Sequence, residues 1–215
     1  MPIKKHIYPV SGIQLAFAEA GIKYKRRNDI ALILADEGSH VSGVFSKNKF
    51  IAAPVIQSKK NLLVGPNKRA LIINTGSANA GTGEIGLIDA QKTCDLVASK
   101  FNLKEDEVLP FSTGVIMTYL PMDKIKDGIS KLPDQLSSNH WVEVAKTIMT
   151  TDTVPKVYSK KIELDNEEIV VTGIAKGSGM IHPDMATTLG FIFTDAKINP
   201  NILKQLLKKN IQNTF

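Results

Sequence analysis

Short apolar runs, separated by glycine-rich or charged turns, recur along this chain and predict strands. Residues 13–20 alternate apolar and polar positions, as a half-buried strand does. Residues 30–35 are continuously apolar, which predicts a central strand. After a turn at residues 36–39, the chain is predicted to return through residues 41–46, and residues 69–74 form the next predicted strand.

Longer periodic stretches predict helices among these strands. A helix is expected over residues 84–101, and another begins at residues 121–125 with a proline in its first turn. Residues 141–149 are amphipathic, and residues 202–211 repeat apolar side chains with the helical period. Residues 157–171 are predicted to form a hairpin. Strands and helices therefore mix along the chain, which indicates the α/β class.

The chain is organised around residues 176–190. Predicted buried strands occupy residues 169–175 and 189–194 on either side of it. Its glycines allow sharp bends, and a lysine stands beside threonine hydroxyls that could act as nucleophiles. Local composition leaves two interpretations open, a plain glycine-rich hairpin loop and a reactive site.

Two other small-residue segments follow predicted strands. Residues 75–83 lead into a helix, and backbone N–H groups at such a place hold anions or polarised carbonyls. The segment lacks the Gly-Lys-Ser/Thr ending of a phosphate-binding loop, and no dinucleotide fingerprint occurs. Ser112-Thr113-Gly114 could present a hydroxyl and an N–H to a site, although the local residues favour an ordinary turn.

Charge and composition narrow the candidate ligands. The chain has 215 residues, is 43% hydrophobic and can bury a sizeable core. Its net charge of +6 is concentrated in the first third and suits nucleic acid or an anionic small substrate. Aromatic residues make up only 6%, and no basic and aromatic sheet motif occurs, so we expect a small substrate and no nucleic acid.

A single cysteine and the absence of long apolar runs bear on the compartment. Cys94 excludes an internal disulfide, fits a reducing compartment, and lies in an amphipathic stretch where a packing role is expected. No apolar signal core and no 18-residue apolar run occur. We therefore expect a soluble cytoplasmic protein without membrane contact.

Several motifs occur together in the order found in one enzyme family. The most specific is Lys176-Gly177-Ser178-Gly179-Met180-Ile181, followed by Pro183 and by Met185-Ala186-Thr187. The others lie at residues 43–45, 52–55, 74–83, 112–116 with 120–123, and 148–153 with 155–156. Through nearly its whole length the chain resembles the ornithine acetyltransferase family, also called bifunctional glutamate N-acetyltransferase.

The resemblance implies a fold and an activity. The fold would be a layered sandwich of two β-sheets flanked by helices, of the self-cleaving ornithine acetyltransferase type, with residues 1–215 as a single domain. Cleavage between Ala186 and Thr187 would divide it into a first chain, residues 1–186, and the start of a second, residues 187–215. The enzyme would move an acetyl group from N2-acetylornithine to glutamate in arginine biosynthesis, with acetyl-CoA as a possible further donor. It would need no metal or organic cofactor, and would assemble as a heterotetramer of two chains of each kind.

The resemblance also carries over site residues. Thr187 would be the nucleophile and pass through an acetyl-threonine intermediate, since a freed α-amine can serve as the base that its hydroxyl requires. Thr113 and Gly114 would form the oxyanion hole. Thr150 and Lys176, together with Thr187, would contact substrate, and Lys176 suits a substrate carboxylate.

The chain departs from the family pattern at several places. Met117 stands where the family usually has glycine, and Gly81 where cysteine is frequent. The family's second chain is about as long as its first, so we expect these residues to be a truncated product or fragment. Strands 30–35 and 169–175 would then keep one face bare, and activity of residues 1–215 alone is not expected. Two other functions stay open: an amidohydrolase or peptidase of the related self-cleaving type, and an inactive remnant.

Overall fold

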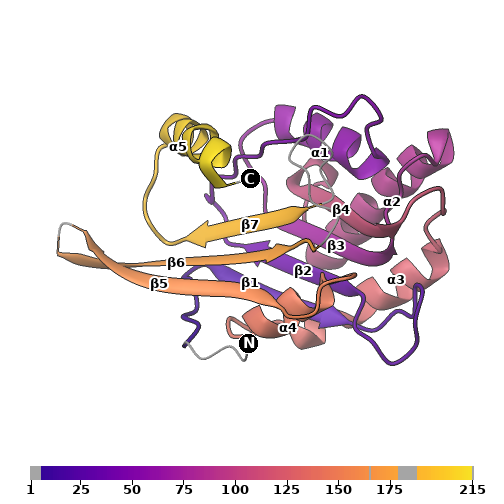
Figure 1. Cartoon of the computed structure of the whole chain (residues 1–215), viewed down its shortest axis with the longest axis horizontal. Helices are drawn as coiled ribbons and strands as arrows, with labels where there is room; N and C mark the ends of the chain where they lie inside the picture. Colours follow the sequence, from indigo (N-terminus) through magenta and orange to yellow (C-terminus); the bar gives the residue numbers. More distant parts are fainter. Residues whose placement is uncertain (1–5, 165, 179–187, 215) are drawn as a thin grey trace.

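Two stacked β-sheets, with helices on the outside, form the body of the computed structural model (Figure 1). The structure describes residues 6–164, 166–178 and 188–214. The first sheet has the order β1-β2-β3-β4, antiparallel except for the parallel pair β3–β4. The second is the antiparallel sheet β5-β6-β7. The strands are β1 Ile13–Ala18, β2 Ile30–Ala35, β3 Ala70–Ser77, β4 Val108–Val115, β5 Lys156–Leu164, β6 Glu167–Lys176 and β7 Leu189–Thr194.

The helices cover the first sheet more completely than the second. They are α1 Ala53–Leu63, α2 Gly83–Phe101, α3 Met122–Lys131, α4 Trp141–Thr147 and α5 Pro200–Thr214, with short 3₁₀ turns η1 Glu105–Glu107 and η2 Pro133–Gln135. This arrangement confirms the layered α/β sandwich expected from the resemblance.

Strand β2 is buried on both faces. Ile30 and Leu32 pack into one core with α2 and α3, whereas Ala31 and Ile33 pack into a second core with α4 and the second sheet. A continuous apolar run is what a doubly covered strand requires. The expectation that residues 30–35 keep one face bare is therefore wrong.

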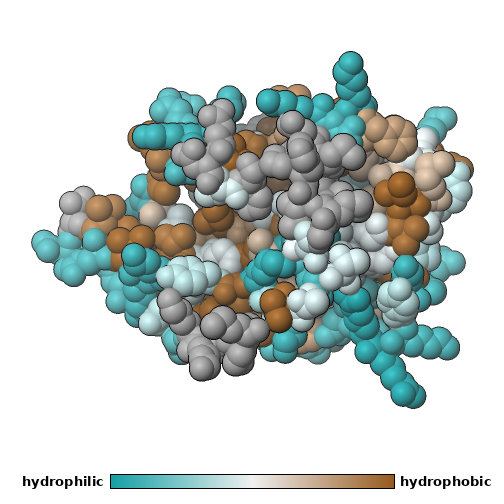
Figure 2. Space-filling view, in the orientation of Figure 1, coloured by the Kyte–Doolittle hydropathy of each residue, from teal (hydrophilic) through white to brown (hydrophobic). Residues whose placement is uncertain are grey.

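Strand β6 alternates between a buried and a less buried face. Val170, Thr172, Ile174 and Lys176 are buried, whereas the residues between them are only half-buried. Ile192 of β7 lies on the outer face and is 70% exposed. Figure 2 shows brown apolar side chains over the β5–β6 hairpin and beside β7. Residues 169–175 were expected to keep one face bare, and the structure shows that face half-buried.

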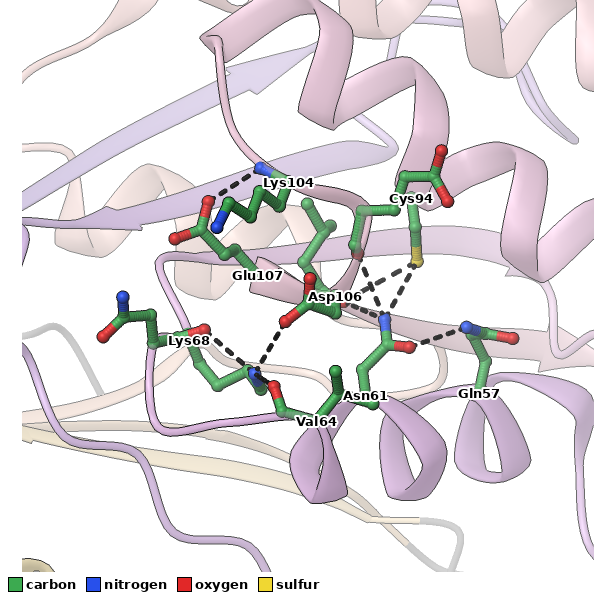
Figure 3. Close-up of polar contacts among 11 residues, drawn as sticks. Gln57, Asn61, Val64, Lys68, Cys94, Lys104, Asp106 and Glu107 are labelled. Carbon is green, nitrogen blue, oxygen red and sulfur yellow. Dashed lines mark hydrogen bonds and ion pairs between the residues drawn. The ribbon is translucent and has the colours of Figure 1, made fainter.

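Helix α1 covers the outer edge of the first sheet with polar side chains. Ser58 Oγ donates to the carbonyl of Pro110 over 2.8 Å, and Asn61 Nδ2 donates to that of Val108 over 2.7 Å. Figure 3 shows Asn61 between α1 and Cys94. These bonds satisfy alternate carbonyls of β4, an edge strand in which Pro110 has no N–H to offer.

Cys94 is a packing residue, as its amphipathic setting predicts. Its thiol is fully buried in α2, and burial, together with the nearby Asp95 carboxylate, raises its pKa to about 12. A thiol with such a pKa stays protonated at neutral pH and is a poor nucleophile.

The prediction of a strand at residues 41–46 is wrong. Residues 41–46 form no strand, because both neighbours of β2 are already in place in the sheet order. The segment instead lines an open groove of about 1940 Å³. The groove lies among the inner faces of β3 and β4, strand β7 and α5, which contribute Leu71, Phe111, Phe193 and Leu207.

Candidate functional site

The Lys176 side chain joins the two sheets. Lys176 is the last residue of β6, and strand alternation places it on the buried face, where it is only 5% exposed. Its Nζ donates to Thr113 Oγ1 over 2.9 Å and to Thr150 Oγ1 over 3.0 Å. Three residues predicted from the sequence therefore meet at one ammonium group.

Thr113 and Gly114 lie where β4 runs beside the end of β3. Gly114 pairs with Gly76 and has a φ of +140°, a value that side chains rarely tolerate. A Cβ at Gly114 would lie 2.6 Å from the Gly76 carbonyl oxygen and 2.7 Å from the nitrogen of Ser77. Only glycine therefore fits here, and the backbone after Thr113 is held in one conformation.

Hydrogen bonds behind this strand end hold it in place. Ser112 Oγ donates to Asn74 Oδ1 over 2.5 Å, and Asn74 Nδ2 donates to the Ser77 carbonyl over 2.9 Å. Strand β3 extends three residues further than predicted, to Ser77, so Thr75 and Gly76 belong to the strand rather than to the loop. Thr113 is consequently mounted on a sheet and not on a mobile turn.

Thr150 lies in the connection between α4 and β5. The carbonyl of the preceding Met149 accepts a hydrogen bond from the Arg27 guanidinium, which comes from the basic loop after β1. The N–H of Thr150 donates to Asp152 Oδ2 over 3.4 Å. This connection is therefore tied to the basic loop just before the threonine and held by an internal hydrogen bond just after it.

Asp152 and Lys156 surround the residue after Lys176. The Gly177 N–H donates to Asp152 Oδ1 over 2.8 Å, the Lys156 ammonium donates to the Gly177 carbonyl over 2.7 Å, and the two side chains form an ion pair. The Asp152 side chain is 1% exposed. Sequence reasoning assigned no role to either residue, although an acid and a lysine four positions apart, within one quoted motif, were a visible signal.

The pKa values of Lys176 and Asp152 are both lowered, for different reasons. Burial lowers the pKa of Lys176, the Asp152 carboxylate acts to raise it, and the Lys156 ammonium acts to lower it. Burial would raise the pKa of Asp152, but hydrogen bonds from Lys156, Gly177 and Thr150 outweigh it and leave the pKa below its ordinary value. Asp152 is thus ionised at neutral pH and compensates positive charge at the site.

The predicted cleavage site, Ala186 and Thr187, lies outside the described residues. The described chain resumes at Thr188, whose hydroxyl donates to the Lys176 carbonyl over 3.0 Å, and Leu189 pairs with Lys176 in the sheet. The segment 178–188 therefore begins and ends beside Lys176.

Met117 occupies a glycine-like conformation. Its φ is +60°, and its N–H donates to the Ala80 carbonyl over 2.8 Å. A Cβ at Gly81 would collide with the Met117 sulfur and lie 3.0 Å from the Phe50 ring. The Met117 side chain therefore occupies space that a side chain at residue 81 would need, so the two departures from the family pattern fit each other. Met117 follows Thr113 and Gly114 closely in the chain.

The described residues form neither a metal-binding cluster nor a membrane-spanning helix. Among them, no group of three or more His, Cys, Asp or Glu side chains is placed to hold a metal ion. No described helix is long and apolar enough to cross a bilayer.

Comparisons with known proteins agree with the motifs. The ArgJ family pattern matches residues 14–215. The "Arginine biosynthesis bifunctional protein ArgJ" of Colwellia psychrerythraea is 44% identical over 211 residues, which cover 94% of this chain and 50% of that protein. The chain spans about half the length of the curated relatives it matches.

Solved structures give the same answer for the fold. A crystal structure of "Arginine biosynthesis bifunctional protein argJ" from Bacillus halodurans has a TM-score of 0.76 and 35% identity, covering 81% of this chain and 91% of that one. "Ornithine Acetyltransferase complexed with Ornithine" from Mycobacterium tuberculosis has a TM-score of 0.74 and 35% identity, covering 81% and 92%. On the family match over residues 14–215 and the identity across almost the whole chain, this protein belongs to the ArgJ family.

Proposed function

We propose that this chain supplies the oxyanion hole and part of the substrate site of an acetyltransferase. The reaction moves an acetyl group from N2-acetylornithine to glutamate, through an acetyl group on Thr187, after cleavage between Ala186 and Thr187. The observation that carries the proposal is the Lys176 ammonium bound to both Thr113 and Thr150 in a chain of the ArgJ family.

The bond directions suit the chemistry. A threonine oxygen that accepts from an ammonium group has its own proton available to donate elsewhere. Thr113 can therefore donate to the negative charge that develops on the acetyl oxygen in the tetrahedral intermediate, and the neighbouring Gly114 N–H would share that charge. The Lys176 charge strengthens both donors and attracts the carboxylate of glutamate or ornithine.

Residues 1–186 are proposed as the first chain and residues 187–215 as the start of the second, in a cytoplasmic assembly of two chains of each kind. The order of the motifs in the sequence supports this division. In the structure, Thr188, the residue after the proposed nucleophile, is hydrogen-bonded to the backbone of Lys176.

Acetyl transfer in a chimera tests the activity. Residues 1–215 are fused to the downstream half of the Colwellia relative, and N-acetylglutamate formed from N2-acetylornithine and glutamate is measured by mass spectrometry. We expect transfer, a split at Ala186–Thr187 in the intact mass, and an uncleaved, inactive Thr187→Ala variant.

The oxyanion assignment has its own variant. Thr113→Ala should reduce turnover by about 10²–10³, with a much smaller change in substrate binding. Release of acetate to water without transfer to glutamate would favour a hydrolase instead. Cleavage of Thr187→Ala at the same bond would remove Thr187 as the nucleophile.

A further inference from the structure

A closed ring of hydrogen bonds surrounds Gly177, the residue that follows Lys176. Gly177 donates its N–H to Asp152 and accepts from Lys156 at its carbonyl, while the Asp152 carboxylate and the Lys156 ammonium pair with each other. Gly177 has a φ of +152°, which disfavours any side chain there. The ring therefore fixes the backbone at the end of β6, at a position that suits glycine better than other residues.

The ring also reaches the second threonine. Asp152 Oδ2 accepts from the N–H of Thr150, so one buried carboxylate bonds the backbone on both sides of the Lys176–Thr150 contact. Lys156 begins β5 and pairs in register with Ala175, the residue before Lys176. A substitution in the ring would thus move the lysine and Thr150 relative to each other.

We propose that Asp152 and Lys156 are positioning residues for Lys176, which hold its ammonium group in place and balance its charge. The part of the proposal that concerns catalysis rests on the proposed function; the part that concerns charge does not. Among the described residues, Asp152 and Lys156 are the charged groups that act on Lys176. Thr113 on β4 and Thr150 after α4 are its neutral partners.

The two positioning residues act on the lysine with opposite signs, which distinguishes this role from a purely structural one. The Asp152 carboxylate favours the protonated lysine, whereas the Lys156 ammonium disfavours it. If the two residues only supported the backbone, removing either one would shift the Lys176 pKa in the same direction. Loss of charge balance predicts effects in opposite directions.

The experiment is a direct titration of Lys176 in the 215-residue chain. Lysine labelled with ¹³C at Cε reports protonation by NMR, and the signal absent from Lys176→Gln assigns the residue. Asp152→Asn should lower the titration midpoint of Lys176, and Lys156→Gln should raise it. The double variant Asp152→Asn/Lys156→Gln should return the midpoint toward that of the unmodified chain.

Matched controls come from the exposed ion pair of the β5–β6 hairpin, Lys161 with Glu168. Lys161→Gln and Glu168→Gln should leave the Lys176 midpoint unchanged. Shifts of the same sign in both ring variants, or no shift in either, would overturn the proposal. If Asp152→Asn does not fold, Lys156→Gln still decides, because an unchanged or lower midpoint contradicts the proposed balance.

The outcome separates this proposal from the function. Opposite midpoint shifts in a protein whose chimera transfers no acetyl group would retain the positioning role and reject the acetyltransferase. Acetyl transfer by the chimera, with a Lys176 titration midpoint that neither ring variant shifts, would support the acetyltransferase and reject the positioning role.

Discussion

Strands β2 and β6 are both interior strands of their sheets, yet they are buried differently. Helices cover one face of β2 and the second sheet covers the other, so its apolar run is continuous. β6 is buried on one face and half-buried on the other, although Ile169 and Val171 on the half-buried face are as apolar as Val170 on the buried one. The site lies between these two environments, with Thr113 from the closed sheet and Lys176 from the half-covered one. Thr113 is therefore mounted on the more completely covered sheet, whereas Lys176 depends on the hydrogen bonds around Gly177.

The largest expected difference between the sheets is in core truncation. Leu32→Ala removes a fully buried side chain from β2 and should lower the free energy of unfolding by about 2–5 kcal/mol. Ile192→Ala, on the outer face of β7, should change it by less than about 0.5 kcal/mol. Urea denaturation measures both. Equal losses would mean that the second sheet is covered on its outer face in solution.

Glycines in the two sheets sharpen the contrast. Gly114→Ala forces a Cβ against the backbone of Gly76 at a left-handed φ, which should cost about 1–2 kcal/mol for the backbone and about 1–3 kcal/mol for overpacking. In Gly173→Ala, the new Cβ would lie 3.6 Å from the Phe191 carbonyl oxygen, an ordinary contact. That variant should be neutral or slightly more stable, because glycine weakens a strand. Thermal denaturation measures both variants, and equal decreases in melting temperature would contradict the expected difference between the two glycines.

The covered edge of the first sheet offers a smaller effect. Asn61→Ala removes the donor to the buried Val108 carbonyl and should cost about 1–3 kcal/mol. Ile56→Ala serves as the control: Ile56 lies on the same helix and is 40% exposed, so its loss should change the free energy of unfolding by less than about 0.5 kcal/mol. Similar values for the two variants would show that α1 is held by apolar contacts instead.

The smallest effect is the acid dependence contributed by Asp152. Its folded pKa lies below the ordinary aspartate value of 3.8, so the unfolded chain binds more protons near that pH. The stabilisation is complete above the unfolded pKa and is lost as the pH falls through the folded pKa. Asp152→Asn should flatten the dependence of unfolding free energy on pH below about 4, whereas Glu168→Gln, in an exposed ion pair, should not. A slope unchanged by Asp152→Asn would mean that the ring does not favour the ionised carboxylate.

The strands could largely be predicted because their signals are local. The period of two in β1 and the apolar run of β2 depend only on which faces are covered. The return predicted at residues 41–46 failed because strand pairing depends on which sheet edges are vacant, and local sequence does not record that. The motif order led to the family, and the comparisons confirm it.

Less of the site could be predicted from the residues themselves. The contact between Lys176 and Thr113 spans 63 positions and depends on how two sheets stack, which no local pattern encodes. The family resemblance gave roles to both residues, but it gave none to Asp152 or Lys156, although both lie within its motifs. Their importance appears only when the Gly177 peptide is seen between them.

The alternation of β6 also limits how this hairpin can change in length. Lys176 faces Thr113 because it shares parity with Val170, Thr172 and Ile174. One residue inserted between Ile174 and the upstream buried positions would turn the lysine to the outer face, whereas a change at the hairpin tip would leave it in place. We therefore expect homologous hairpins to vary freely at the tip, and to accept insertions within the strand only in pairs or as bulges.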